Sequence, residues 1–135
     1  MYYFCGYVII FLMMLNHIIQ EQTLIVLQRE YLKQVYVCSG YARLYKDIVL
    51  YLNLEVECVS SYAKGASYKI GENMKKSNHE YNVIKLDNKW YPMDSTWGAG
   101  SVDGENFNKC FNEIYFLPNP ELLITSHFPV DENCN

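Results

Sequence analysis

The stretch NHEYNVIKLDNKWYPMDSTWGAG, residues 78–100, decides the fold predicted for this chain. Two strand-like runs, 79–86 and 89–95, flank Asp87-Asn88, a pair that tolerates the positive φ of a tight hairpin turn. A hairpin needs alternating side chains and a turn. It does not need His79 near one end, Asp94 near the other and a Trp-Gly-Ala-Gly loop after them, so these residues indicate a candidate site.

The register of this hairpin follows from its turn. With two turn residues, Tyr81 faces Asp94 and His79 faces Thr96. His79, Tyr81 and Asp94 then project from one face of the ribbon. His79 and Asp94 become diagonal neighbours about 7–8 Å apart at Cα, close enough for an imidazole and a carboxylate to meet. The spacing therefore predicts a carboxylate that orients an imidazole.

The segment VYVCSGYARLYKDIVLYLN, residues 35–53, predicts a helix that begins at or just before Ser39 and stops near Asn53. Its apolar residues recur at helical spacing: Tyr41, Leu44, Tyr45, Ile48, Val49 and Leu52. Cys38 then lies at the N-terminal tip, where unpaired N–H groups and the helix dipole lower a thiol pKa from about 8.5 toward neutrality. An imidazolium nearby lowers the thiol pKa further.

The chain order Cys38, His79, Asp94 follows the logic of papain-like nucleophiles. A thiolate attacks a carbonyl, the histidine moves the proton, and the aspartate fixes the tautomer. The backbone N–H of Cys38 is one candidate oxyanion donor, and a second donor is not identifiable. Taken singly, each residue also has a structural interpretation, as a buried thiol, an edge histidine or a turn acceptor. His17 and His127 receive only that structural interpretation.

The remaining segments predict one α+β domain. We expect a helix over 20–33, a strand over 55–64, a polar loop over 65–78, and a strand over 114–117 that Pro118 and Pro120 end. Residues 1–19 are an apolar segment preceding the core at 20–135. That segment fits a buried helix, a membrane anchor or signal, or a stretch foreign to the fold at a truncated chain start, and we favour no membrane association.

Composition narrows the function classes. The net charge of −4, with no cluster of basic residues, argues against nucleic-acid binding. Five irregularly spaced cysteines without a CxxC pair argue against a zinc ribbon or a disulfide scaffold, and they favour a reducing, cytoplasmic setting. Thirteen tyrosines suit a broad groove or a half-buried rim. We predict no metal and no cofactor.

Four motifs, CSGYARLY, YAKGASYKIG, residues 78–100 and NEIYFLPNPELLITSHFP, together resemble the transglutaminase-like core of the kyphoscoliosis peptidase and hillarin group over residues 24–130. The resemblance implies that Cys38 is the nucleophile, His79 the general base and acid, and Asp94 the orienting carboxylate. It also implies a papain-like α+β core, in which a helix bearing the thiol packs on an antiparallel sheet. Groove or supporting positions are Tyr81, Asn82, Thr96 and Trp97.

The chain departs from the pattern of that group in several ways. Tyr81 stands where the group usually has Trp, and the Gly common shortly before the cysteine is missing. No counterpart of the group's upstream helix is found in residues 1–23. The chain also stops after HFPVDENCN, where relatives continue, so we expect a core fragment.

Two functions from different classes remain open. The first is a transglutaminase-like cysteine enzyme that forms a thioacyl intermediate from a protein or peptide amide. Water would then make it a peptidase or deamidase, and a lysine amine would make it a cross-linker. The second is an inactive module that binds cytoskeletal or scaffold proteins through a Tyr-rich groove, with a cytoskeleton-associated location.

Overall fold

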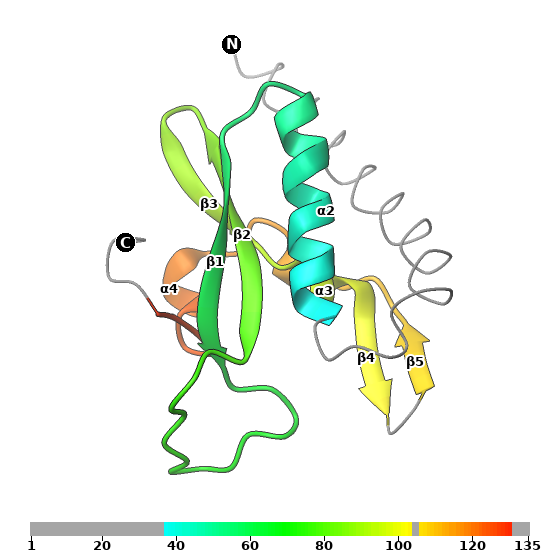
Figure 1. The fold of residues 1–135 in the computed structure, drawn as a ribbon, viewed down its shortest axis with the longest axis vertical. Coiled ribbons are helices and arrows are strands. Elements are labelled where there is room, and N and C mark those ends of the chain that lie inside the picture. The colour runs from blue at the N-terminus through cyan, green and yellow to red at the C-terminus, as the bar shows by residue number, and fades with distance from the viewer. Residues whose placement is uncertain (1–36, 104–105, 131–135) are drawn as a thin grey trace.

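The computed structural model describes residues 37–103 and 106–130, and Figure 1 shows their arrangement. Helices and strands alternate irregularly along the chain rather than in βαβ units. In chain order the elements are α2 (Val37–Tyr51), β1 (Val56–Ala63), β2 (His79–Leu86), β3 (Lys89–Met93), α3 (Ser95–Ala99), β4 (Gly100–Asp103), β5 (Asn106–Lys109), the 3-10 helix η1 (Glu113–Tyr115), α4 (Pro120–Leu123) and β6 (His127–Pro129).

The main sheet has the strand order β3-β2-β1-β6, and each neighbouring pair is antiparallel. One face packs against α2 through a core of Tyr45, Val49, Val56, Ile84 and Met93. The other face carries a smaller cluster, which includes Leu123 of α4. Strands β4 and β5 form a separate two-stranded sheet (Figure 1). The predicted α+β class, with a helix packed on an antiparallel sheet, is confirmed.

Helix α2 forms where the sequence predicts it. Its buried residues Tyr41, Tyr45 and Val49 lie four positions apart on one side of the helix, and Tyr45 and Val49 belong to the core against the sheet. Leu44, Ile48 and Leu52 flank them and are partly buried against the same core. The chain leaves the helix through Asn53, whose φ of 57° is the left-handed conformation expected after a helix end.

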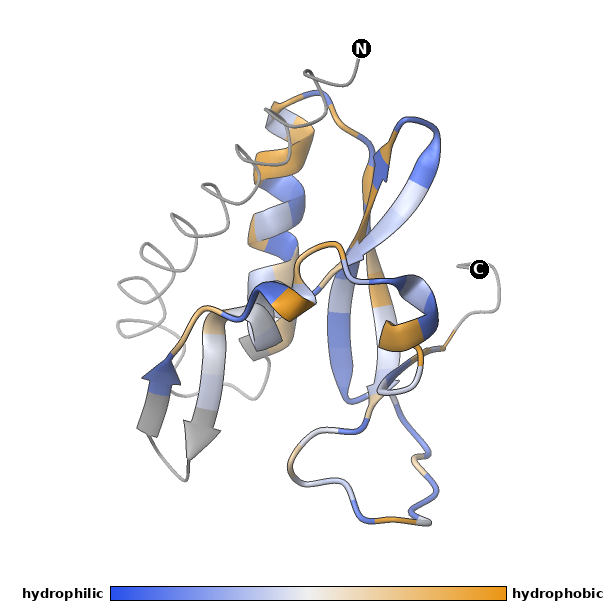
Figure 2. Cartoon of the chain, turned by 180° about the vertical axis from the view of Figure 1, so that it is seen from behind, coloured by the Kyte–Doolittle hydropathy of each residue, from blue (hydrophilic) through white to orange (hydrophobic). Residues whose placement is uncertain are grey.

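The β2–β3 hairpin also has the predicted turn, because Asp87 and Asn88 take φ values of 48° and 61°. Leu86 pairs with Lys89 across this two-residue turn, and the hairpin tip is coloured hydrophilic in Figure 2. The strand pairing ends at Asn82↔Met93.

Two predicted strand pairs of that hairpin do not form. Tyr81 does not face Asp94 across a ladder, and His79 does not face Thr96, because β3 stops at Met93 and Asp94 begins a helix. The expected Trp-Gly-Ala-Gly loop is instead helix α3 followed by β4. The physical reason is the Asp94 side chain, which caps the N–H groups that follow it.

The predicted strand at 114–117 is wrong. Residues 113–115 form the 3-10 helix η1, which the Asn112 side chain caps by accepting from the backbone N–H of Ile114. Only an isolated bridge between Phe116 and Met93 remains of the expected pairing. Leu117 has a φ of 46°, a conformation that no strand can propagate through.

Two other predictions, the apolar segment 1–19 and the helix over 20–33, lie outside the described residues. Within 37–103 and 106–130, none of the helices has the length and apolar character needed to span a bilayer.

Candidate active site

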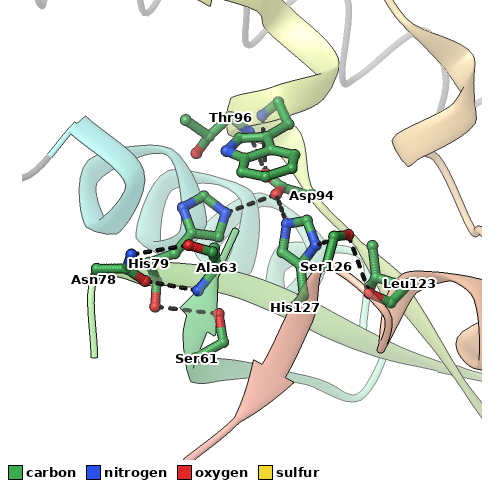
Figure 3. A network of polar contacts seen from close by, with 10 residues as sticks. Ser61, Ala63, Asn78, His79, Asp94, Thr96, Leu123, Ser126 and His127 are labelled. Carbon is green, nitrogen blue, oxygen red and sulfur yellow. Dashed lines mark hydrogen bonds and ion pairs between the residues drawn. The ribbon is translucent and has the colours of Figure 1, made fainter. Parts of the chain in front are cut away.

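Asp94 is the centre of the candidate site, and its two carboxylate oxygens have separate tasks (Figure 3). Oδ1 caps α3 by accepting from the backbone N–H groups of Thr96 and Trp97, at 2.9 and 3.0 Å. Oδ2 contacts Nε2 of His79 at 2.6 Å and Nε2 of His127 at 2.8 Å. Asp94 is fully buried, so every partner of this carboxylate comes from the protein.

His79 reaches Asp94 from the first position of β2, where it pairs with Ser61 of β1. The preceding residue fixes this strand start. The side chain of Asn78 accepts from the backbone N–H of Ala63 at 2.7 Å and donates to the carbonyl of Ala63 at 2.9 Å. The imidazole is buried, and its ring centroid lies 5.4 Å from that of Trp97. The proximity of His79 and Asp94 was predicted, although Asp94 arrives from a helix cap and not from a strand pair.

His127, for which the sequence predicted only a structural role, also contacts Asp94 and belongs to the candidate site. It is buried, it pairs with Ala63 across β1, and its Nδ1 lies 2.8 Å from the Ser126 hydroxyl. Its ring lies 4.3 Å from the ring of Trp97, centroid to centroid. No local pattern around HFP marks it, because only the pairing of β6 with β1 brings it to Asp94.

Cys38 occupies the second position of α2 and is half-buried. Burial opposes ionisation of its thiol, but a hydrogen bond with His79, the positive charge of that ring, and the backbone N–H groups of Glu80 and Ser39 outweigh it. The pKa of the Cys38 thiol is therefore lowered. Asp94 occupies Nε2 of His79, so Nδ1 is the ring nitrogen left to the thiol.

His79 and Asp94 carry opposite charges, because their pKa values are shifted in opposite directions. Burial alone would lower the pKa of His79, but the hydrogen bonds with Asp94 and Cys38 raise it to about 9. Burial likewise opposes ionisation of Asp94, yet hydrogen bonds from His127 and His79 lower its pKa to about 2. Near neutral pH the imidazole of His79 is thus protonated between a carboxylate and a thiol whose own pKa is depressed.

The four predicted supporting residues divide into two groups. Asn82 is fully buried beneath α2 and donates to the carbonyl of Ala42 at 3.0 Å, so it fixes the helix that carries Cys38. Tyr81 is buried with its ring 5.8 Å from that of His127. Trp97 and Thr96 instead line a pocket.

That pocket has a volume of about 880 Å³ and begins beside the candidate site. Trp97, which contacts the His79 ring, forms one wall, and Tyr41, three residues after Cys38 on α2, forms another. Gly65 approaches so closely that an added Cβ would lie 3.3 Å from the Trp97 ring. The remaining lining residues include aromatic, polar and cationic side chains: Lys64, Ser101, Cys110, Phe111, Asn112 and Tyr115.

His79, Asp94 and His127 are also a residue set that can hold a metal, since one ligand atom of each lies within 4.8 Å of the others. Their spacing is that of hydrogen bonds, however, at 2.6 and 2.8 Å between nitrogen and oxygen. Two ligand atoms on a tetrahedral zinc ion lie roughly 3.4 Å apart. A metal would therefore have to spread these atoms and displace both bridging protons.

A helix-borne thiol beside a His–Asp pair is the arrangement expected of a transglutaminase-like module, and comparison with known proteins agrees with this class. The chain is 36% identical over 99 residues to the kyphoscoliosis peptidases of mouse and human, which confirms the resemblance inferred from the motifs. The match covers 71% of this chain but only 15% of the length of those relatives. No family model matches the chain.

Proposed function

We propose that this chain is a transglutaminase-like cysteine enzyme, which transfers an acyl group from a protein or peptide amide through a Cys38–His79–Asp94 triad. The observation that carries the proposal is the position of His79. One ring nitrogen bonds the buried Asp94 carboxylate, and the same ring lowers the pKa of the Cys38 thiol. A histidine that only stabilised the sheet would need neither partner.

The first half-reaction would form a thioester. The Cys38 sulfur attacks the amide carbon and a C–S bond forms, while charge develops on the carbonyl oxygen. The backbone N–H of Cys38, in the first turn of α2 where no preceding helical carbonyl is available, would donate to that oxygen. The C–N bond then breaks, and the leaving amine takes the proton from the imidazolium of His79.

The second half-reaction would reverse these roles. Water or a lysine amine attacks the thioester carbon, and its proton passes to His79. The C–S bond then breaks, and Cys38 returns to the thiolate. Attack by water makes the enzyme a peptidase or deamidase, and attack by an amine makes it a cross-linker. Throughout, the Asp94 carboxylate would keep Nε2 of His79 protonated and Nδ1 facing the sulfur.

The pocket beside Trp97 supports a peptide as substrate. Its aromatic walls suit an apolar side chain next to the reacting carbonyl. Lys64, Ser101 and Asn112 add polar groups to the same lining, which suit the backbone amides of a peptide. The proposal includes a papain-like core as its fold, a cytoplasmic setting, and cytoskeletal proteins as candidate partners.

The test is alkylation of the full 135-residue chain with iodoacetamide at pH 6, read out for each cysteine by peptide mass spectrometry. We expect Cys38 to react at least about tenfold faster than Cys110, because only a thiol with a depressed pKa is ionised at this pH. Cys110 is the internal control, since it is exposed and free. His79→Ala should reduce the Cys38 rate to that of Cys110.

A second measurement separates catalysis from mere thiol reactivity. Release of p-nitrophenolate from p-nitrophenyl acetate reports acylation of Cys38 without knowledge of the natural substrate. Cys38→Ser should abolish the burst. If Cys38 is alkylated no faster than Cys110 and no burst is seen, the enzymatic proposal fails, and binding of a scaffold protein becomes the better interpretation of this fold.

A further inference from the structure

The Asp94 carboxylate accepts as many hydrogen bonds as its oxygens can. A carboxylate has about four lone-pair directions, two on each oxygen. Thr96 and Trp97 fill those of Oδ1 from the backbone of α3. His79 and His127 fill those of Oδ2. Since Asp94 is fully buried, removal of one donor leaves a lone pair that water cannot reach without a rearrangement.

The proton positions on His127 follow from this geometry. An ionised carboxylate only accepts, so Nε2 of His127 carries the hydrogen that it donates to Oδ2. Ser126 holds the other side of the ring, because its Oγ lies 2.8 Å from Nδ1 and is itself fixed by donating to the backbone carbonyl of Leu123 at 3.2 Å.

The strand register explains why two histidines converge on one oxygen. Strand β1 lies between β2 and β6, with Ser61 opposite His79 and Ala63 opposite His127. Residues two apart on a strand project to the same face, so their partners do too. The two imidazoles therefore meet in edge contact, with ring centroids 5.2 Å apart, on the side where Asp94 enters.

We propose that His127 is a positioning residue of this active site, which holds Oδ2 of Asp94 in line with Nε2 of His79 through its own Nε2–H. This inference rests on the proposed function, because positioning has a catalytic consequence only if His79 serves Cys38. It makes β6 part of the site and extends the triad to a chain of Cys38, His79, Asp94, His127 and Ser126.

The position of the carboxylate is sensitive to His127. Without its donor, Oδ2 has one partner instead of two, so less holds the carboxylate against rotation about its Cβ–Cγ bond. The Nε2–H group of His79 would then point at an acceptor that is no longer held in one position. Packing alone cannot replace this donor, although the His127 ring also fills space beside Trp97.

Two substitutions distinguish the effect of the His127 N–H donor from the effect of the volume of its ring. His127→Phe keeps a ring beside Trp97 but has no N–H, whereas His127→Gln carries an amide N–H near the position of Nε2. Phe128→Leu is the matched control, because Phe128 is the next residue of β6 and its side chain is 59% exposed. Circular dichroism and thermal unfolding of each full-length variant establish that it folds.

The first readout is acylation of Cys38 by p-nitrophenyl acetate at pH 7. We expect His127→Phe to lower the rate at least about tenfold, the size of effect of one hydrogen bond to a charged group. His127→Gln should stay within about threefold of the unmodified chain, and Phe128→Leu should not differ from it. Equal rates for the folded Phe variant and the unmodified chain would overturn the proposal.

The second readout does not depend on reaction. The proton in the 2.6 Å bond from Nε2 of His79 to Asp94 should give a low-field, slowly exchanging NMR signal. That signal should persist in His127→Gln and broaden in His127→Phe. If the NMR pattern holds but the unmodified chain is never acylated, the proposed function fails and the positioning role stands. If acylation occurs and the signal is the same in all variants, the positioning role fails alone.

A third variant keeps the proposal testable if His127→Phe does not fold. Ser126→Ala leaves the imidazole in place and removes only the hydroxyl beside Nδ1. We expect it to lower the acylation rate about threefold, because the ring then loses the contact that holds it in the orientation in which Nε2–H points at Oδ2. An unchanged rate in this variant would contradict the proposal.

Discussion

Asp94→Asn removes one charge and exchanges one oxygen for a donor, with almost no change in volume. The helix cap survives, because Asn caps helices about as well as Asp. The amide has a single oxygen, however, and Asp94 uses both of its oxygens to accept N–H groups. If that oxygen stays at the cap, the amide N–H group opposes Nε2 of His79. The ring must then give up its Nε2 proton and become neutral, with its remaining proton on Nδ1, the nitrogen that faces Cys38.

The expected size of the effect follows from the charge on His79. Its pKa of about 9, against 6.5 for an unperturbed imidazole, corresponds to about 3 kcal/mol of stabilisation of the imidazolium. Part of this comes from Cys38, so we assign about 2 kcal/mol to Asp94, or roughly a 30-fold change in an equilibrium constant. Alkylation of Cys38 at pH 6 should therefore slow roughly 30-fold in the variant.

The assay is the peptide-resolved alkylation described above, with circular dichroism to establish folding. Asp87→Asn is the matched control, because Asp87 is exposed at the hairpin tip, where its φ of 48° suits Asn equally well. It should leave the Cys38 rate unchanged. A folded Asp94→Asn variant whose Cys38 reacts at the unmodified rate would refute the idea that this carboxylate controls the imidazole and, through it, the thiol.

Two further predictions concern pH and the support of α2. The raised pKa of His79 stabilises the folded state below pH 6.5, and this contribution is lost as the pH rises through about 9. The lowered pKa of Cys38 stabilises the folded state above pH 9.0, and that contribution is lost as the pH falls through the depressed pKa of the thiol. The two contributions have opposite signs, so the melting temperature should fall less between pH 7 and 9 in the unmodified chain than in Cys38→Ser. Parallel curves would contradict the coupling. Asn82→Asp places an acceptor-only group against the carbonyls of Ala42 and Glu57, at 3.0 and 3.3 Å, and should cost at least about 3 kcal/mol in urea unfolding. Asn82→Leu should cost less, because it also removes the buried Oδ1 that has no partner; equal costs would show that the donor is unimportant.

The elements that could be predicted from the sequence are those fixed by local pattern. The apolar spacing of α2, its end at Asn53 and the turn at Asp87-Asn88 each depend on residues within a few positions of one another. The prediction of a strand at 114–117 was wrong for a related reason. Its apolar residues suit a strand, but the Asn112 cap and the positive φ of Leu117 turn the backbone away from the sheet.

The site shows the same division between local and long-range information. His79 and Asp94 could be placed together because only 15 residues separate them, even though the assumed strand pair does not exist. The contacts of Asp94 could be predicted only in part, because its two oxygens accept from different groups. One serves the local cap that an Asp-Ser-Thr sequence favours, and the other serves groups from β2 and β6.

The sequence by itself thus indicated which residues supply the thiol, the imidazole and the carboxylate of the candidate site, and it placed Cys38 at the start of a helix. Periodicity, capping and turn preferences are local properties, so they can be read along the chain. Only the tertiary structure decided that His127 joins them, 33 residues from Asp94. Its place depends on β6 adding to the far side of β1, and such a pairing is set by burial of the whole sheet face, which no short motif records.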